Sequence, residues 1–132
     1  MYGRLFDSSR GIIMANELDS QFLQAVTAFV ELRNTQDLQG ILRLMHQESF
    51  AYKPMQQVLL KLFTAFELQT VLLERVFIAR ENEYVYVRIK LRTEKIAGPD
   101  FKNNIAEFLV VFRIVGNVWK IWCQSPLTFR LL

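Results

Sequence analysis

The apolar residues of this chain change their spacing near its middle, from a helical period to a strict alternation. In the first half they recur three and four positions apart, which is the spacing of one face of an α-helix. This pattern predicts helices over 17–33, 37–47 and 54–66, with Asn16 as the first N-cap and Pro54 as a first helical residue. Each predicted helix is amphipathic, so another element must cover its apolar face.

The second half has the alternation of β-strands. The predicted strands span 70–80, 84–93, 105–115 and 118–124. Gly116-Asn117 between the last two is the signal of a two-residue hairpin loop, which places Val115 opposite Val118. Helices followed by a run of antiparallel strands predict the α+β class, with a curved antiparallel sheet wrapped around three N-terminal helices.

The register of the last hairpin separates an apolar face, which should meet the helices, from a mixed one. The apolar face contains Phe108, Val110, Phe112, Ile114, Trp119, Ile121 and Cys123. Because Cys123 lies in this set, we expect a buried, inert thiol. The strand over 70–80 leaves two possibilities open, since one phase turns Arg75 inward and the other turns Glu74 inward.

Length and composition fit one globular domain. The chain has 132 residues, 52% of them hydrophobic and 22% charged, with a net charge of +3. We expect a single domain over 1–132, in which 1–15 is an N-terminal extension and 126–132 a C-terminal tail. Leu127 and Phe129 alternate with polar residues in this tail, so it should form an edge strand or a lid that buries Phe129.

Cysteine content and hydropathy set the expected compartment. The single cysteine cannot form an internal disulfide, which fits a reducing environment. No apolar run approaches the roughly 18 residues that would span a bilayer. The opening MYGRLFDSSRGIIMA also lacks the apolar core of a signal peptide. We therefore expect a cytoplasmic protein with no membrane partner.

Three stretches resemble the nuclear-transport-factor-two-like (NTF2-like) superfamily, which includes the SnoaL-like polyketide cyclases and the ketosteroid isomerases. NTQDLQGILRLMHQ resembles its second helix, VFIARENEYVYVRIKL a strand–turn–strand, and EFLVVFRIVGNVWKIWCQS its closing hairpin. The resemblance covers residues 17–125 and implies a cone-shaped α+β barrel. Many members place His before a Ser at the end of the last strand. Here Cys123, Gln124 and Ser125 stand at those positions, so the frequent polar cavity residue is missing.

The predicted interior favours binding over catalysis. Catalytic members of that superfamily place a carboxylate or His inside the cone as general acid or base. The predicted inward faces offer at most one ionisable side chain, so we assign no catalytic residue. One His and one Cys do not make a ligand set, so neither a metal nor a cofactor is expected. The predicted ligand-binding residues are Arg75, Phe112, Trp119, His46 and Tyr52, with His46 partly exposed.

The mixed face of the sheet is the predicted dimer interface. It gathers Tyr86, Arg88, Lys90, Leu109, Val111, Arg113, Lys120 and Trp122. A monomer rarely leaves an exposed Trp beside aliphatic residues, and Trp122 is expected at the centre of this face. Arg113 stands opposite Lys120, a like-charge pair for which Glu107 and Glu74 are the expected acids, either within the chain or across a two-fold axis. Aromatic and basic residues also suit single-stranded RNA, but the charge of +3 is modest, so nucleic acid is not the expected partner.

The function predicted from the sequence is a non-catalytic homodimeric binding or assembly module. Its apolar cavity would hold a small ligand or a segment of a partner protein. The alternative, which the resemblance implies, is a small cofactor-independent lyase or isomerase of the polyketide-cyclase or ketosteroid-isomerase type. A third class is a regulatory domain that oligomerises a larger complex. The apolar interior favours binding, and the mixed sheet face favours assembly.

Overall fold

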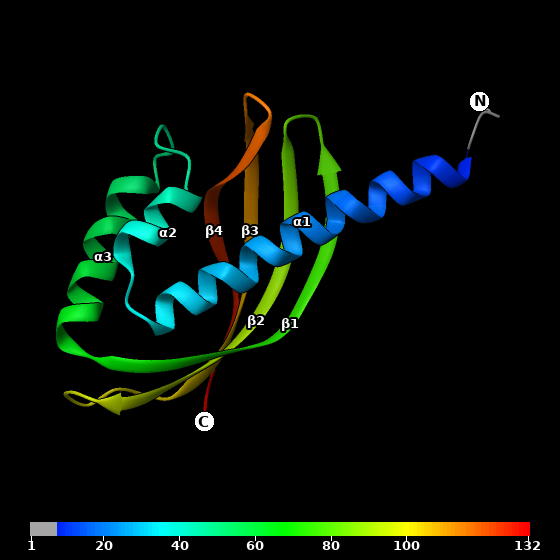
Figure 1. Ribbon diagram of the computed structural model, residues 1–132. Helices are drawn as coiled ribbons and strands as arrows, with labels where there is room; N and C mark the ends of the chain where they lie inside the picture. Colours follow the sequence, from blue (N-terminus) through cyan, green and yellow to red (C-terminus); the bar gives the residue numbers. More distant parts are fainter. Residues whose placement is uncertain (1–7) are drawn as a thin grey trace.

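The computed structural model describes the backbone of residues 8–132 and the side chains from Asp19 onward. Within this part of the chain, three helices precede four strands (Figure 1). The elements are α1 Ser8–Asn34, α2 Leu38–Leu44, α3 Tyr52–Ala65, β1 Glu67–Glu81, β2 Tyr84–Ala97, β3 Asn104–Val115 and β4 Val118–Leu131. Every predicted helix and strand is present, and β1, β2 and β4 are longer than their alternation indicated.

The strands form one antiparallel sheet in the order β1-β2-β3-β4. The β3–β4 hairpin has the predicted register, with Val115 opposite Val118. Gly116 in its turn has a φ of 59°, a left-handed conformation that glycine adopts without steric cost. The sheet curves strongly and the helices lie against one face, which we call the inner face (Figure 1). The predicted α+β class, a curved antiparallel sheet around three helices, is confirmed.

The first and third helices begin earlier than predicted. α1 begins at Ser8 instead of Glu17, so part of the predicted extension is helical and Asn16 lies inside the helix. α3 begins at Tyr52, which makes Pro54 its third residue. Proline is tolerated there because the N–H groups of the first turn have no partner within the helix.

The second helix is shorter than predicted. The Asp37 carboxylate accepts a hydrogen bond from the backbone N–H of Gly40 at 2.9 Å, which caps the N-terminus of α2. The helix ends at Leu44, because the chain then leaves it to run beside β4. There the backbone N–H of His46 donates to the carbonyl of Ile121 at 2.8 Å.

The hydrophobic core lies between the inner face and the helices. Its buried members are Phe22, Val26, Phe29, Val30, Ile41, Leu42, Met45, Leu59, Val85, Val87, Ile89, Leu91, Val110, Phe112 and Ile121. The alternating apolar residues of β2 are therefore inward, as predicted. In α3, Leu59 is buried, whereas Val58 of the predicted apolar stripe is 59% exposed.

A β-bulge in β4 exchanges the faces of its last residues. After Ile121 the ladder skips Trp122, so that Cys123 pairs with Val111 on the outer face and Gln124 turns inward. The prediction that Cys123 is a buried member of the inward set is therefore wrong. The side chain is half-buried on the outer face, where partial burial raises the pKa of its thiol.

Irregular pairing in β1 resolves the face that the sequence left open. Glu74 pairs with Lys90 on the outer face, and Arg75 pairs with Ile89 on the inner face. A register shift between Leu72 and Glu74 allows both Leu72 and Arg75 to face inward. Neither strictly alternating phase describes the whole strand.

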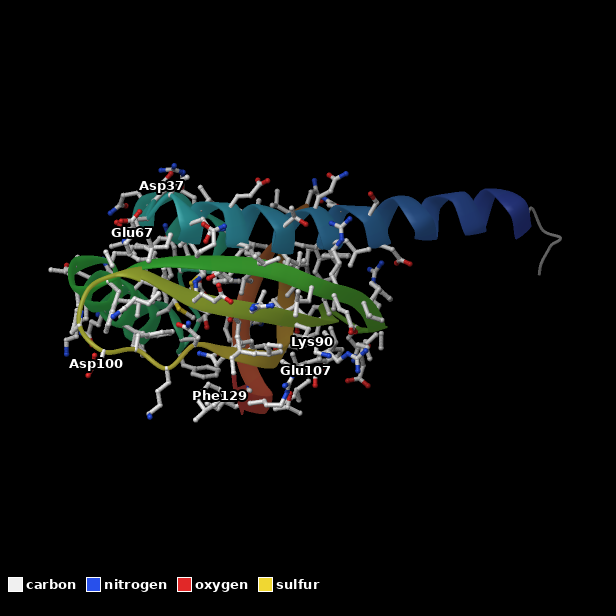
Figure 2. All side chains as sticks on the ribbon, turned by 90° about the horizontal axis from the view of Figure 1, so that it is seen from below. Asp37, Glu67, Lys90, Asp100, Glu107 and Phe129 are labelled. Atoms are coloured by element: carbon white, nitrogen blue, oxygen red, sulfur yellow. The ribbon has the colours of Figure 1, made fainter. Side chains whose placement is uncertain are left out.

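The predicted C-terminal tail is the last part of β4. Phe129 pairs with Ala106 and Leu131 with Asn104, so the tail forms the expected edge strand along β3. Phe129 nevertheless remains 64% exposed and projects from the sheet (Figure 2). Its predicted burial is wrong, because the helices cover the inner face only beside the earlier part of β4 (Figure 1).

Candidate functional site

The structure does not bring the predicted ligand-binding residues together around one cavity. Phe112 is buried in the core with its ring centroid 5.2 Å from that of Phe22. Trp119 meets the same Phe22 ring edge to face at 5.2 Å. Arg75 lies on the edge strand β1, where its Nη1 donates to the Leu23 carbonyl at 2.8 Å and to the Thr27 hydroxyl at 2.7 Å. These side chains join α1 to the sheet.

His46 and Tyr52 lie on the opposite side, between α2 and α3. His46 is only 8% exposed, which corrects the predicted partial exposure. Its Nδ1 accepts a hydrogen bond from the backbone N–H of Glu48 at 3.1 Å, so the neutral ring carries its proton on Nε2. Tyr52 opens α3 and packs against the core. Arg43 and Lys120 line a surface hollow of about 330 Å³ together with His46.

A smaller hollow lies at the end of the inner face that the helices leave open, and we call it the end hollow. It measures about 140 Å³ and is lined by Arg33, Leu62, Leu68, Leu91, Thr93, Phe101, Asn104, Ala106, Phe108 and Phe129. Leu91 and Ala106 are buried and form its floor, and the exposed Phe129 stands at its rim. Apolar walls with a few polar groups are the usual lining of a small-molecule site.

Arg33 is the charged residue of the end hollow. It lies in the last turn of α1, and burial lowers the pKa of its guanidinium. Thr93 and Asn104 add a hydroxyl and an amide, and the Thr93 hydroxyl lies 3.5 Å from that of Thr70. The sequence analysis missed Arg33, because a basic residue in the last turn of a helix ordinarily complements the helix dipole.

Gln124 places a second polar group in the interior. Its Nε2 is buried and has no hydrogen-bond partner among the described residues. Without the bulge at Trp122 the side chain would face outward, so periodicity alone assigned it to the wrong face. The last strand therefore carries an inward polar group at Gln124. This corrects the prediction that the end of this strand lacks a polar residue facing the interior.

By register, every predicted interface residue except one lies on the outer face. The side chain of Lys120 extends from there to α2, where its Nζ donates to the Arg43 carbonyl at 2.5 Å. Tyr86 pairs with Val111 at its centre, and Arg88 pairs with Leu109. Lys90 pairs with Glu107, and the two side chains lie close together on the sheet (Figure 2). Since Val111 is 9% exposed, its larger neighbours already cover much of it.

Trp122 is the exception, because it occupies the bulge at the margin of the sheet. Its ring meets His46 edge to face at 5.0 Å and Phe50 at 6.4 Å. The guanidinium of Arg113 lies 4.6 Å from the ring centroid, within the range of a cation–π contact. Trp122 thus packs on its own chain, and its predicted position at the centre of the face is wrong.

The predicted like-charge pair is present, but a different acid balances it. Arg113 lies opposite Lys120, as expected from the register. The Nε of Arg113 donates to the Glu83 carboxylate at 3.0 Å, and this bond raises the pKa of Arg113. Within the chain the predicted acids, Glu107 and Glu74, lie in another row of the ladder and do not balance Arg113. Their approach to Arg113 across a two-fold axis stays a prediction.

Among the described side chains, from Asp19 to Leu132, no group of three or more His, Cys, Asp or Glu residues is arranged to hold a metal ion. None of the helices in the described part of the chain combines the length and the apolar character needed to cross a bilayer.

Solved structures with the same fold have little sequence identity to this chain. An NTF2-like protein from Cytophaga hutchinsonii has a TM-score of 0.68 at 12% identity, covering 81% of this chain and 94% of that one. A ketosteroid isomerase-like protein from Erwinia carotovora atroseptica has a TM-score of 0.57 at 15% identity, covering 80% and 92%. Bd1075 from Bdellovibrio bacteriovorus has a TM-score of 0.68 at 13% identity, covering 82% of this chain and 40% of that one. These similarities confirm the NTF2-like fold.

Sequence comparison assigns the chain to a family. No curated protein matches the sequence. The model of one protein family, described as the C-terminal domain of anti-sigma-I factor RsgI9, matches residues 24–131. This match includes every strand of the sheet and most of the helical layer. The chain therefore belongs to the family of the RsgI9 C-terminal domain, which here has an NTF2-like fold.

Proposed function

We propose that this protein is a non-catalytic binding module whose ligand site is the end hollow. The observation that carries this proposal is a hollow of about 140 Å³ with a buried floor, apolar walls and three polar side chains. Ligand sites are mostly apolar and carry a few polar groups that fix the orientation of the ligand, and the end hollow has such a lining. The ligand would replace water against Leu91, Ala106 and Phe108.

The polar lining supports binding more than acid–base chemistry. Arg33, Thr93 and Asn104 supply hydrogen-bond donors at the hollow. A general acid or base works best with a pKa near the operating pH, which threonine and asparagine do not offer. The lyase or isomerase of the ketosteroid-isomerase type remains the alternative. Proton exchange at the α-carbon of a ring ketone, catalysed by the protein, would favour it.

Assembly through the outer face of the sheet is the second part of the proposal. Tyr86 and Leu109 form a half-buried apolar centre there beside the buried Val111, and Arg88 and Lys90 flank it. Aromatic residues and arginine are enriched in interface cores. A two-fold axis through this face would bring each apolar centre against its own copy, as in a homodimer.

Nuclear magnetic resonance with a neutral probe tests the binding proposal. Titration with 2-phenylethanol should shift the backbone amides of Leu91, Phe108 and Phe129 in a saturable manner. Ala106→Leu adds side-chain volume to the floor of the hollow and should abolish those shifts. Ala79→Leu makes the same change on the exposed part of β1, and it should leave binding unchanged. Equal shifts in all three proteins would contradict the proposed site.

A further inference from the structure

Arg33 carries a positive charge that the described part of its own chain does not balance. The guanidinium is half-buried, and within residues 19–132 it forms neither an ion pair nor a hydrogen bond. The last carbonyl groups of α1 are occupied, since Glu31 accepts from the N–H of Thr35 and Leu32 from that of Asp37. A partly desolvated cation is costly unless an anion or acceptors compensate it.

The carboxylates that are close to Arg33 in sequence are already engaged or face water. Asp37 accepts the N–H of Gly40 as the cap of α2, and Glu31 is exposed. The ion pairs of the sheet join Glu74, Glu83 and Glu94 to arginines and a lysine outside the end hollow. The complementary anion is therefore expected to arrive with the ligand.

The size and lining of the hollow suit a small aromatic ring as the apolar part of the ligand. A cavity of about 150 Å³ lined by Leu, Ile and Phe holds a benzene molecule, and the end hollow measures about 140 Å³. Phe101, Phe108 and Phe129 line it, which offers ring edges and faces to an aromatic ligand. The ring of Phe101 is itself held by Phe66, with centroids 5.5 Å apart.

We infer that the ligand of the end hollow is a single-ring aromatic carboxylate whose acid group is bound by Arg33. This inference rests on the proposed binding function and names its ligand class. The planar guanidinium matches both oxygens of a carboxylate, and such charge-assisted pairs are the stronger hydrogen bonds of proteins. An oxygen that Arg33 leaves free accepts from the Thr93 hydroxyl, or from the Asn104 amide N–H that does not already donate to the Lys102 carbonyl. The ring packs against Phe108 and beneath Phe129.

Paired probes separate this inference from the proposed function. Phenylacetate and 2-phenylethanol share one ring and nearly one shape, and they differ in charge. Calorimetric titration of the wild-type protein should give an affinity for phenylacetate at least tenfold higher than for 2-phenylethanol. In Arg33→Met the affinity for phenylacetate should fall at least tenfold, so that its preference over 2-phenylethanol disappears. Arg130→Met removes the same charge from an exposed position on the outer face and should retain the wild-type preference.

The other possible results of the titrations contradict either the carboxylate inference alone or both proposals. If the wild type binds both probes equally, the carboxylate inference is overturned while the binding function stands. If neither probe binds at millimolar concentration, both proposals fail. Should Arg33→Met not fold, amide shifts of the wild type decide the question. Phenylacetate must then shift Thr93 and Asn104, and shifts confined to the surface hollow at Arg43 and Lys120 would overturn the inference.

Discussion

Replacing Gln124 with Met should stabilise this protein, although most substitutions of inward residues destabilise. The bulge in β4 turns Gln124 toward the interior, where its Nε2 is buried without a partner in the described structure. Methionine has the same unbranched length as glutamine and carries no donor that needs a partner. The substitution therefore removes an unsatisfied group with little change of shape.

The expected increase in the free energy of unfolding follows from the cost of burying an unpaired hydrogen-bond donor, which is about 1–3 kcal/mol. Since Gln124 is only half-buried as a residue, we expect the lower half of this range, about 1–2 kcal/mol. In a chain of 132 residues this corresponds to a rise in melting temperature of roughly 2–8 °C. Urea unfolding followed by tryptophan fluorescence measures it as a higher midpoint at an unchanged slope.

A matched control separates this effect from general hydrophobic gain. Gln69→Met makes the same change at an exposed position of β1 and should alter the free energy of unfolding by no more than about 0.5 kcal/mol. A Gln124→Met protein less stable than wild type would refute the reasoning. It would mean that the amide has a partner, such as an ordered water.

Three further predictions concern the sheet. Leu109→Glu should convert a dimer into a monomer, as measured by light scattering. The monomer should stay folded, because Arg88 beside residue 109 can pair with the new carboxylate. A wild type that is monomeric at tens of micromolar contradicts the dimer. Burial raises the pKa of the Cys123 thiol, so iodoacetamide should label it more slowly in the native than in the urea-unfolded protein at pH 8. For the same reason the free energy of unfolding should fall above pH ~8.5, because unfolding then releases the thiol proton. Deleting 127–132 should lower the melting temperature by removing edge pairing with β3; an unchanged melting curve would show that this pairing contributes nothing.

The elements and most of their pairing could be predicted from local signals. Because an apolar face must be buried, the alternation in β2 predicts which residues face the helices. These residues are Val85, Val87, Ile89 and Leu91, and all four face inward. Gly116-Asn117 fixed the register of the hairpin because a two-residue loop allows only one. These features depend on neighbours in sequence.

The candidate site depends on contacts that local signals do not report. The bulge at Trp122 has no residue signature, yet it moves Cys123 outward and Gln124 inward. In the sequence, Arg33 looks like any basic residue in the last turn of a helix. The hollow beside it exists only because β2, β3 and α3 pack around it. The tail pattern allowed an edge strand or a lid, and the edge strand forms. The exposure of Phe129 follows from how far the helices reach along the sheet.

A crystal structure of the wild-type protein with phenylacetate tests the proposed site most directly. We expect density for one ring among Leu91, Phe108 and Phe129, with a carboxylate oxygen about 3 Å from the guanidinium of Arg33. A ligand bound elsewhere, with the end hollow filled by the protein's own side chains, would contradict the assignment of this hollow as the binding site.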